Sequence, residues 1–439
     1  MRQIPISRAA APAKEAGNAL GQFAYVLLCA FVFVIPWEDT VPEFGGFVIG
    51  RWIGLLALGT AVMSVIVLAQ GRKLRELHYW MLAFVGWSSV SIWWTMDFET
   101  TAVRIGTYSQ LLVLVWLIWV LADTEARVLG LLQSYVFGTY VCAIGTISNL
   151  MAGRTTAQLD DYSQGELQGR QAFKTDRYTI NGVNPNELGL MLAVSIPLCL
   201  YLVVRRKGSL ARVLCWLQLV LCLTTILLSG SRGAMLAAMV ALVMFPLTVF
   251  RLPRWQQLLA GVACAGVIVS SAFLVPPETW RRFLKLGSEI SEGTMTHRTQ
   301  IWAASMEVFR DHAFVGVGSG AHEVAVMPII SRPLVAHNTF LSVLVELGVA
   351  GELLLLGLLA TAFYSALRMR GLERILWILT LAVWCIGANG GTWEYRKATW
   401  FLWSLPTAHA YVRRKAKSQV LCGRVQARAA NNDILLLMR

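Results

Sequence analysis

Three basic residues, Arg232, Arg298 and His337, stand in local sequences that suit chemistry on a phosphate-bearing substrate. Glycines and serines surround Arg232 and leave backbone amides accessible at the start of a helix, which is a typical phosphate site. Arg298 begins an amphipathic helix, so its guanidinium and the helix dipole can act on an anion together. His337 begins a nearly all-apolar helix, and arginines nearby would lower its pKa and keep the ring neutral. These residues predict a site that binds an anion and accepts a proton.

Each of the three also has a structural explanation, and the sequence alone leaves both explanations open. Arg232 would cap a loop and reach lipid headgroups, Arg298 would be an ordinary interfacial arginine, and His337 would anchor its helix at the membrane surface. A second basic pair, Lys174 and Arg177, precedes a predicted helix start. A solvated loop explains this pair better, although we keep both residues as candidate contacts to the anion.

Two acidic pairs, Glu38-Asp39 and Asp160-Asp161, could hold a divalent cation or supply a base. Charged residues in loops are usually solvated, and we favour that explanation for both pairs. The histidines show no spacing typical of zinc ligands. We therefore expect neither a metal site nor a cofactor.

The composition indicates a membrane protein. The 439 residues are 56% hydrophobic and 14% charged, whereas a soluble domain carries roughly 25% charged residues. A membrane span needs about 20 mostly apolar residues, and runs of about that length recur along the whole chain. We predict an all-α integral membrane protein, a single polytopic domain over residues 1–439 with about twelve transmembrane helices. The predicted spans are 19–36, 52–70, 79–95, 105–122, 128–151, 187–204, 211–229, 234–250, 257–275, 349–367, 375–390 and 398–412.

The positions of lysine and arginine predict the orientation, because cytoplasmic segments of membrane proteins are enriched in both. With the N-terminus inside, the cytoplasmic segments hold 23 of the 38 basic residues and 6 of the 25 acidic residues. Both termini are then cytoplasmic, including a basic tail at 413–439, and the loops 152–186 and 276–348 are periplasmic. The net positive charge is thus explained by the orientation of the protein in the membrane. We expect membrane lipids as partners and no nucleic acid.

The large loop 276–348 contains most of the candidate chemistry. Its residues 297–311 have the periodicity of an amphipathic helix, which is too short to span a membrane and would lie along the surface. A second short helix follows His337, and its Asn338 and Glu346 are spaced to share one face. We expect Asn338 or Glu346 to orient the histidine or the acceptor.

The motifs around these residues resemble those of lipopolysaccharide O-antigen ligases. The stretch His337-Asn338-Thr339-Phe340-Leu341, with ten residues between His337 and Gly348, resembles the signature of that family. Gly348 also suits a turn before the next span. By these motifs the resemblance covers residues 184–348, and by topology the whole chain. The further motifs similar to those of the ligase/polymerase superfamily are Gly230-Ser231-Arg232-Gly233, His297-Arg298 with Trp302, Gly316-Val317-Gly318 and Asn184-Pro185-Asn186.

The resemblance implies an inverting, metal-independent membrane glycosyltransferase with a GT-C-like helical fold and a periplasmic active site in the bacterial inner membrane. Its donor would be O-antigen on undecaprenyl diphosphate, and its acceptor would be the lipid A–core oligosaccharide. Arg232 and Arg298 would bind the donor diphosphate, and His337 would activate the acceptor hydroxyl. Glu394, in the last outer loop, matches an acidic position of some family members and would help to orient the acceptor.

Several alternatives stay open. An O-antigen polymerase would use the same chemistry with a second polyprenyl-diphosphate-linked glycan as acceptor, and a protein O-glycan ligase is similar. A transporter or flippase is a different class, and Pro197 and Pro246 interrupt two predicted spans as the broken helices of transporters do. The predicted spans, however, are nearly free of charge at their centres, and no inverted repeat is visible. A purely structural membrane anchor does not explain the arginines in the outer loops.

Overall fold

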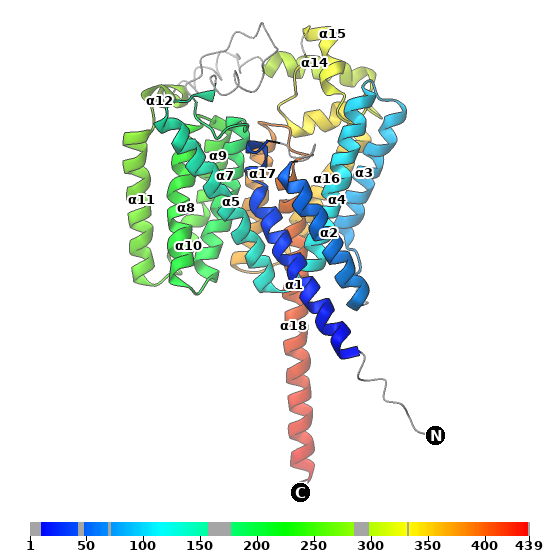
Figure 1. Ribbon diagram of the computed structural model, residues 1–439, viewed down its shortest axis with the longest axis vertical. Helices are drawn as coiled ribbons and strands as arrows, with labels where there is room; N and C mark the ends of the chain where they lie inside the picture. Colours follow the sequence, from blue (N-terminus) through cyan, green and yellow to red (C-terminus); the bar gives the residue numbers. More distant parts are fainter. Residues whose placement is uncertain are drawn as a thin grey trace.

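The computed structural model describes residues 10–42, 48–68, 72–156, 177–284, 298–331 and 333–437. Within these residues all regular secondary structure is helical and no strand is present, which confirms the predicted all-α class. Long helices pack side by side in one bundle, and shorter ones cross one end of it (Figure 1).

Residues 10–156 supply α1 to α5, and residues 177–437 supply α7 to α18. The described helices are α1 (Ala10–Val34), α2 (Ile49–Leu68), α3 (Glu76–Val90), α4 (Phe98–Leu121), α5 (Glu125–Met151), α7 (Pro185–Arg205), α8 (Ser209–Leu228), α9 (Arg232–Leu242), α10 (Met244–Val249), α11 (Arg254–Leu274), α12 (Pro277–Leu284), α14 (Arg298–Asp311), α15 (His322–Ile330), α16 (Thr339–Leu367), α17 (Leu372–Ala388) and α18 (Lys397–Leu437), with short 3-10 turns at Glu38–Thr40 and Ser91–Trp93.

Eight of the predicted spans coincide with helices that are long and apolar enough to cross a membrane, counted over the described residues. These spans are α2, α4, α5, α7, α8, α9 with α10, α11 and α16. The other four predicted spans are helical as well. They lie in α1, whose apolar part is Asn18–Val34, in α3, in α17 and at the start of α18. The chain is therefore a multi-pass helical protein, and the number of membrane-spanning helices, about twelve, stays a prediction.

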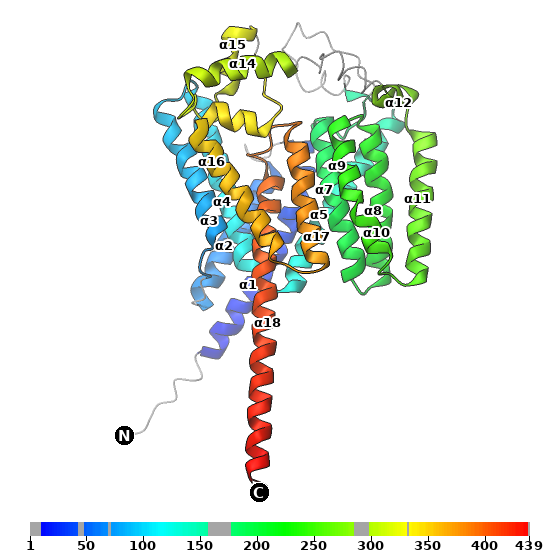
Figure 2. The same cartoon turned by 180° about the vertical axis from the view of Figure 1, so that it is seen from behind.

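The two ends of the bundle differ. At one end, called here the loop end, α12, α14 and α15 lie across the tips of the long helices (Figures 1 and 2). From the opposite end, called the tail end, α18 projects well beyond its neighbours. We predicted a span at 398–412 followed by a basic tail, and in the structure one helix runs through both, from Lys397 to Leu437.

The helix α7 is the innermost span. Of its apolar window 89% is buried inside the protein, against 17% for α11 at the edge of the bundle. It packs against α5, α8, α9 and α17. Because α7 is held on all sides, its first residues, Asn184 to Glu187, occupy a fixed place at the loop end.

Two predicted features of the large loop are confirmed. In α14 the side chains of Ile301, Ala304 and Val308 are buried on one face, as the periodicity predicted. Gly348 has φ 67 and ψ −170 and breaks α16 into a short first part and a long second part. A Cβ at this glycine would lie 2.3 Å from the carbonyl oxygen of Phe314, so both the conformation and the packing require glycine.

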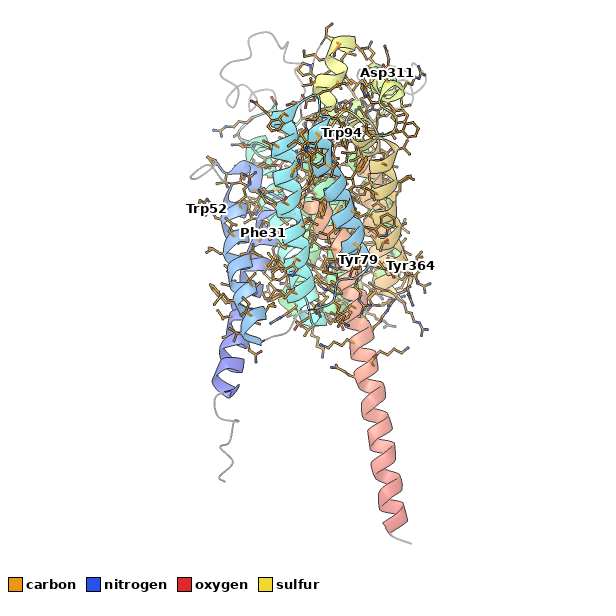
Figure 3. The ribbon with its side chains drawn as sticks, turned by 90° about the vertical axis from the view of Figure 1, so that its right-hand side faces the viewer. Phe31, Trp52, Tyr79, Trp94, Asp311 and Tyr364 are labelled. Carbon is orange, nitrogen blue, oxygen red and sulfur yellow. The ribbon has the colours of Figure 1, made fainter. Side chains whose placement is uncertain are left out.

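Large aromatic side chains are exposed on the outside of the bundle. Trp52 on α2, Tyr79 on α3 and Tyr364 on α16 are 41%, 60% and 50% exposed, and Trp52 and Tyr364 lie at opposite sides of the bundle in Figure 3. Amphipathic aromatic rings of this kind are typical of the boundary between membrane and water.

Candidate functional site

A cavity of about 200 Å³ lies at the loop end and gathers several of the predicted residues. Five separate segments form its wall: the start of α7, the start of α9, the start of α14, the segment before α16, and the end of α17 with its connection to α18. Its lining residues are Asn184, Asn186, Glu187, Leu190, Ser231, Gly233, Ala234, Arg298, Val335, His337, Gly387, Gly390, Gly391, Thr392, Trp393 and Tyr395.

Arg232 is placed at this cavity by a tight turn between α8 and α9. Gly230 adopts φ 57, which favours glycine, and Ser231 caps α9 by accepting a hydrogen bond from the Ala234 amide at 3.4 Å. A Cβ at Gly189 of α7 would lie 2.4 Å from the Ala234 side chain, so α7 and α9 approach closely here. Arg232 therefore sits between two lining residues, Ser231 and Gly233, at the start of a helix.

Arg298 points from the start of α14 into the cavity wall. Its guanidinium Nη2 donates a hydrogen bond to the carbonyl oxygen of Gly390 at 3.3 Å. Burial lowers the pKa of Arg298, and the nearby positive charge of Arg232 lowers it further, yet an arginine stays charged near neutrality. The Arg298 side chain is half-buried and lines the cavity. Arg232 at the edge of the cavity is close enough to act on the Arg298 charge.

His337 lies just before α16 and lines the cavity. Its φ of 49 is unusual for a residue other than glycine, and such strain often accompanies functional positions. Two contacts hold the chain on either side. The Trp302 indole donates to the carbonyl oxygen of Ala336 at 2.9 Å, and the Asn338 side chain accepts from the Phe340 amide at 3.1 Å. Both contacts fix the direction in which the His337 ring leaves the backbone.

The ring of His337 is neutral near pH 7. Burial lowers its pKa to about 4, and the charge of Arg298 and the neighbouring His322 ring contribute in the same direction. None of the residues that the structure describes donates to or accepts from the ring. A neutral imidazole that faces a cavity and lies beside a cation can accept a proton from a hydroxyl bound there.

Asn338 and Glu346 do not line the cavity. The Asn338 carboxamide oxygen caps α16 through the amides of Phe340 and Leu341. Glu346 is 3% exposed, and its two oxygens accept from the Ser342 hydroxyl at 3.1 Å and from the Gly320 amide at 2.6 Å. Their contacts are those of residues that hold the fold, and the role in orienting the acceptor stays a prediction.

Glu394 turns away from the cavity, although Trp393 and Tyr395 on either side of it line the wall. It is completely buried, and its Oε1 accepts from Arg104 Nη1 at 3.1 Å. Its Oε2 has no hydrogen-bond partner among the described residues. Burial raises the pKa of Glu394 to about 7, while Arg104 opposes that shift and Glu346 adds to it. This carboxyl can exchange a proton near neutrality, but not in contact with the cavity.

Arg177 does not line the cavity, but it holds together two segments that do. Its Nε donates to the carbonyl oxygen of Ser229 at 2.7 Å, and its Nη2 donates to Asn186 Oδ1 at 2.8 Å. It thereby ties the turn before Arg232 to the first residues of α7. The structure replaces the solvated loop that we favoured for Arg177 with this half-buried brace, whereas Lys174 lies outside the described residues.

The acidic pair Glu38-Asp39 is not a solvated loop pair. Glu38 pairs with Lys397, and Asp39 accepts from Arg396 Nη1 at 3.3 Å, which fixes the end of α1 to the start of α18. Asp160-Asp161 lies outside the described residues. Over the residues that are described, no group of three or more His, Cys, Asp or Glu side chains is arranged to hold a metal ion.

The connection between α17 and α18 is the part of the site that sequence reasoning missed. Glycines at 387, 390 and 391 line the cavity with Trp393 and Tyr395. The Thr339 hydroxyl at the start of α16 donates to the carbonyl oxygen of Gly391 and accepts from the Trp393 amide, both at 2.9 Å. A cluster of glycines that ends in an aromatic residue directly after a span was the available signal.

The fold and the site define a multi-pass membrane protein whose cavity at one end holds an arginine beside a neutral histidine. Residues 217–356 match the family model described as O-antigen ligase. This match contains Arg232, Arg298 and His337, and it supports the predicted membership of the O-antigen ligase superfamily. A search of curated proteins found no match to the chain.

Proposed function

We propose that this protein is an O-antigen ligase that transfers glycan from undecaprenyl diphosphate to a sugar hydroxyl of the lipid A–core oligosaccharide. The observation that supports the proposal most is the cavity that Arg298 and His337 share, with Arg232 at its edge. A glycosyl diphosphate needs cations at its leaving group and a base at the attacking hydroxyl, and this cavity holds both kinds of group side by side.

In the proposed reaction, Arg232 and Arg298 bind the diphosphate of the donor. The acceptor hydroxyl attacks the anomeric carbon from the face opposite the diphosphate, and the new C–O bond forms as the bond to the diphosphate breaks. His337 takes the hydroxyl proton, and undecaprenyl diphosphate leaves with the electron pair. Stabilising the developing charge on the leaving oxygen with a fixed cation contributes roughly 10²- to 10³-fold in rate.

The cavity is small, which bears on how the substrates bind. A volume of about 200 Å³ accommodates the diphosphate and part of the reacting sugar, whereas the polyprenyl chain and the remaining glycan must extend outside it. Both reactants are lipid-anchored, so we infer that they enter sideways from the bilayer beneath α14. In this proposal the loop end is periplasmic, the tail end is cytoplasmic, and the protein lies in the bacterial inner membrane.

The proposed chemistry is metal-independent, because arginines neutralise the diphosphate themselves. Purified protein in detergent, supplied with lipid-linked glycan and lipid A–core, should form the ligated product in the presence of excess EDTA. Activity that disappears with EDTA and returns with Mg²⁺ would contradict this part of the proposal.

An O-antigen polymerase is the second candidate, since the same cavity would serve a second polyprenyl-linked glycan as acceptor. The two functions differ in what accumulates when the protein is deleted. Uncapped core together with polymerised glycan on polyprenyl diphosphate indicates the ligase. Core that carries a single repeat unit indicates the polymerase.

A further inference from the structure

A second cavity, of about 420 Å³, lies at the tail end between α3, α16 and α18, far from the site described above. It is called here the tail-end pocket. Its charged lining residues are Arg75, Glu76, Arg368, Arg414 and Lys415. Four cations and one carboxylate thus face a single space, and the proposed glycan transfer uses none of them.

Two other cations at the tail end, Arg127 and Arg413, are paired with acids. Arg127 donates to Asp123 at 3.2 Å, and Arg413 pairs with Glu125 at 3.0 Å and also with Glu373. The two carboxylates neutralise the charge of Arg413, whereas its sequence neighbour Arg414 lines the tail-end pocket.

The four cations of the tail-end pocket differ in this respect. No ion pair within the described residues includes any of them, namely Arg75, Arg368, Arg414 or Lys415. Like charges gathered in one pocket repel each other, so a counter-ion bound there would be stabilised.

Neutral contacts orient the guanidinium groups of the pocket. Arg368 Nη1 donates to the Tyr364 hydroxyl at 2.9 Å, and the Arg75 guanidinium lies 5.2 Å from the centre of the Tyr411 ring. Each contact leaves most of the guanidinium N–H donors available, because an arginine has five of them. Donors that are held in place but not neutralised are suited to a phosphate group.

Apolar surface continues from this pocket toward the middle of the bundle. Tyr79 and Leu82 on α3 are 60% and 46% exposed, and Leu353 and Leu356 on α16 are 61% and 45% exposed. Helices α3 and α16 pack against each other, and Tyr79 and Tyr364 lie close to the tail end in Figure 3. A cationic pocket at the membrane surface with exposed apolar side chains on the same helices fits an amphipathic anion.

We propose that the tail-end pocket binds the phosphate of an anionic glycerophospholipid, whose acyl chains lie along α3 and α16. Basic pockets between transmembrane helices recognise such headgroups by charge and by arginine hydrogen bonds. The helices that form the pocket also reach the loop end, because α16 begins two residues after His337 and α18 begins two residues after Tyr395. Bound lipid would therefore hold together helices that position the site, and the proposal does not depend on which sugar is transferred.

The test uses the full-length protein purified in detergent, with phosphatidylglycerol as the probe. Native mass spectrometry should show phosphatidylglycerol retained in preference to zwitterionic phosphatidylcholine, and phosphatidylglycerol should raise the Tm. The double variant Arg368→Gln/Arg414→Gln should bind it roughly 10- to 30-fold more weakly. Each basic residue near a membrane surface contributes about 1 kcal/mol to the attraction, and about 1.4 kcal/mol corresponds to a tenfold change in affinity. The matched control Arg251→Gln/Arg254→Gln removes two exposed arginines of the tail end outside the pocket and should bind like wild type.

Three results would overturn the proposal. Equal weakening in the pocket and control variants would mean that binding follows the net charge of the tail end. Full competition by soluble glycerol phosphate would assign the pocket to a free phosphate. A photoactivatable phosphatidylglycerol that crosslinks wild-type protein only outside α3, α16 and α18 would place the lipid elsewhere, and this readout needs no variant to fold.

Discussion

Arg298 and Arg396 lie at the same end of the bundle, and they differ in what holds them. Arg396 Nη2 pairs with Glu187 at 2.6 Å and its Nη1 with Asp39 at 3.3 Å. Arg298 donates to a backbone carbonyl oxygen, and within the described residues no ion pair includes it. One arginine is neutralised by carboxylates of the fold, and the other keeps its charge beside the cavity.

The difference teaches that residue type alone does not mark a binding site. Arg396 joins α1, α7 and α18 and so holds the cavity wall, whereas Arg298 lies close to a second cation, Arg232. An anion bound beside two neighbouring cations is stabilised by both. The predictions below test this division between a cation that binds substrate and a cation that holds the fold.

The largest effect is expected for Arg298→Ala. Loss of the cation at the diphosphate should lower the rate of glycan transfer by about 10²- to 10³-fold, as measured with purified protein and lipid-linked donor. Arg298→Lys should rescue poorly, because lysine lacks the planar fork of donors. Arg310→Ala, which changes an exposed arginine of the same helix, is the control and should stay within about twofold of wild type. Normal transfer by Arg298→Ala would contradict the assignment of Arg298 as a substrate-binding cation in contrast to Arg396.

Arg396→Ala should act on stability instead. It leaves the Glu187 carboxylate without its partner at the cavity wall, which should cost about 1–3 kcal/mol in the free energy of unfolding and lower the Tm. Arg298→Ala removes a cation from beside Arg232 and should leave the Tm unchanged or raised. If Arg396→Ala abolished transfer at an unchanged Tm, Arg396 would have to be counted among the substrate-binding residues.

The pH dependence separates the free enzyme from the complex with donor. The pKa of His337 is lowered to about 4, so its ring stays neutral down to low pH and activity should be lost only as the pH falls through that value. A bound diphosphate opposes the charge of Arg298 and raises this pKa. The acid limb of kcat should therefore lie at higher pH than the acid limb of kcat/KM, which reports the free enzyme. Coincident limbs, or limbs that persist in His337→Gln, would exclude His337 as the titrating base.

Glu394→Gln should have the smallest effect. The pKa of Glu394 is about 7, so its carboxyl is partly protonated near neutrality and glutamine mimics the protonated form. The substitution keeps an acceptor for Arg104, and we expect transfer within about twofold of wild type in the same assay. A large loss of transfer together with a normal His337→Gln enzyme would assign the role of base to Glu394.

The sequence predicted those parts of the molecule that depend on local pattern. Apolar runs located the long helices, and periodicity located the buried face of α14, because both follow from where apolar side chains must lie. Gly348 was recognisable because few other residues adopt its conformation. The motifs around Arg298 and His337 were recognisable from their resemblance to one family, and the structure brings these two residues to one cavity.

Long-range pairing could not be predicted. Glu38 and Lys397 are 359 positions apart, and nothing in either local sequence indicates that they pair. The brace from Arg177 to Ser229 also depends on three-dimensional packing. The cavity wall from Gly387 to Tyr395 was missed for the same reason, since a short loop between two spans has no periodicity from which to place it.

The central claim is that one cavity binds the donor through arginines and activates the acceptor through His337. It is tested most directly by measuring donor binding and transfer separately, with a polyprenyl diphosphate-linked glycan and the purified variants His337→Ala and Arg298→Ala. We predict that His337→Ala binds the donor with wild-type affinity while its transfer rate falls by about 10²- to 10⁴-fold, and that Arg298→Ala loses both. Wild-type donor binding by Arg298→Ala, or loss of donor binding by His337→Ala, would contradict the account.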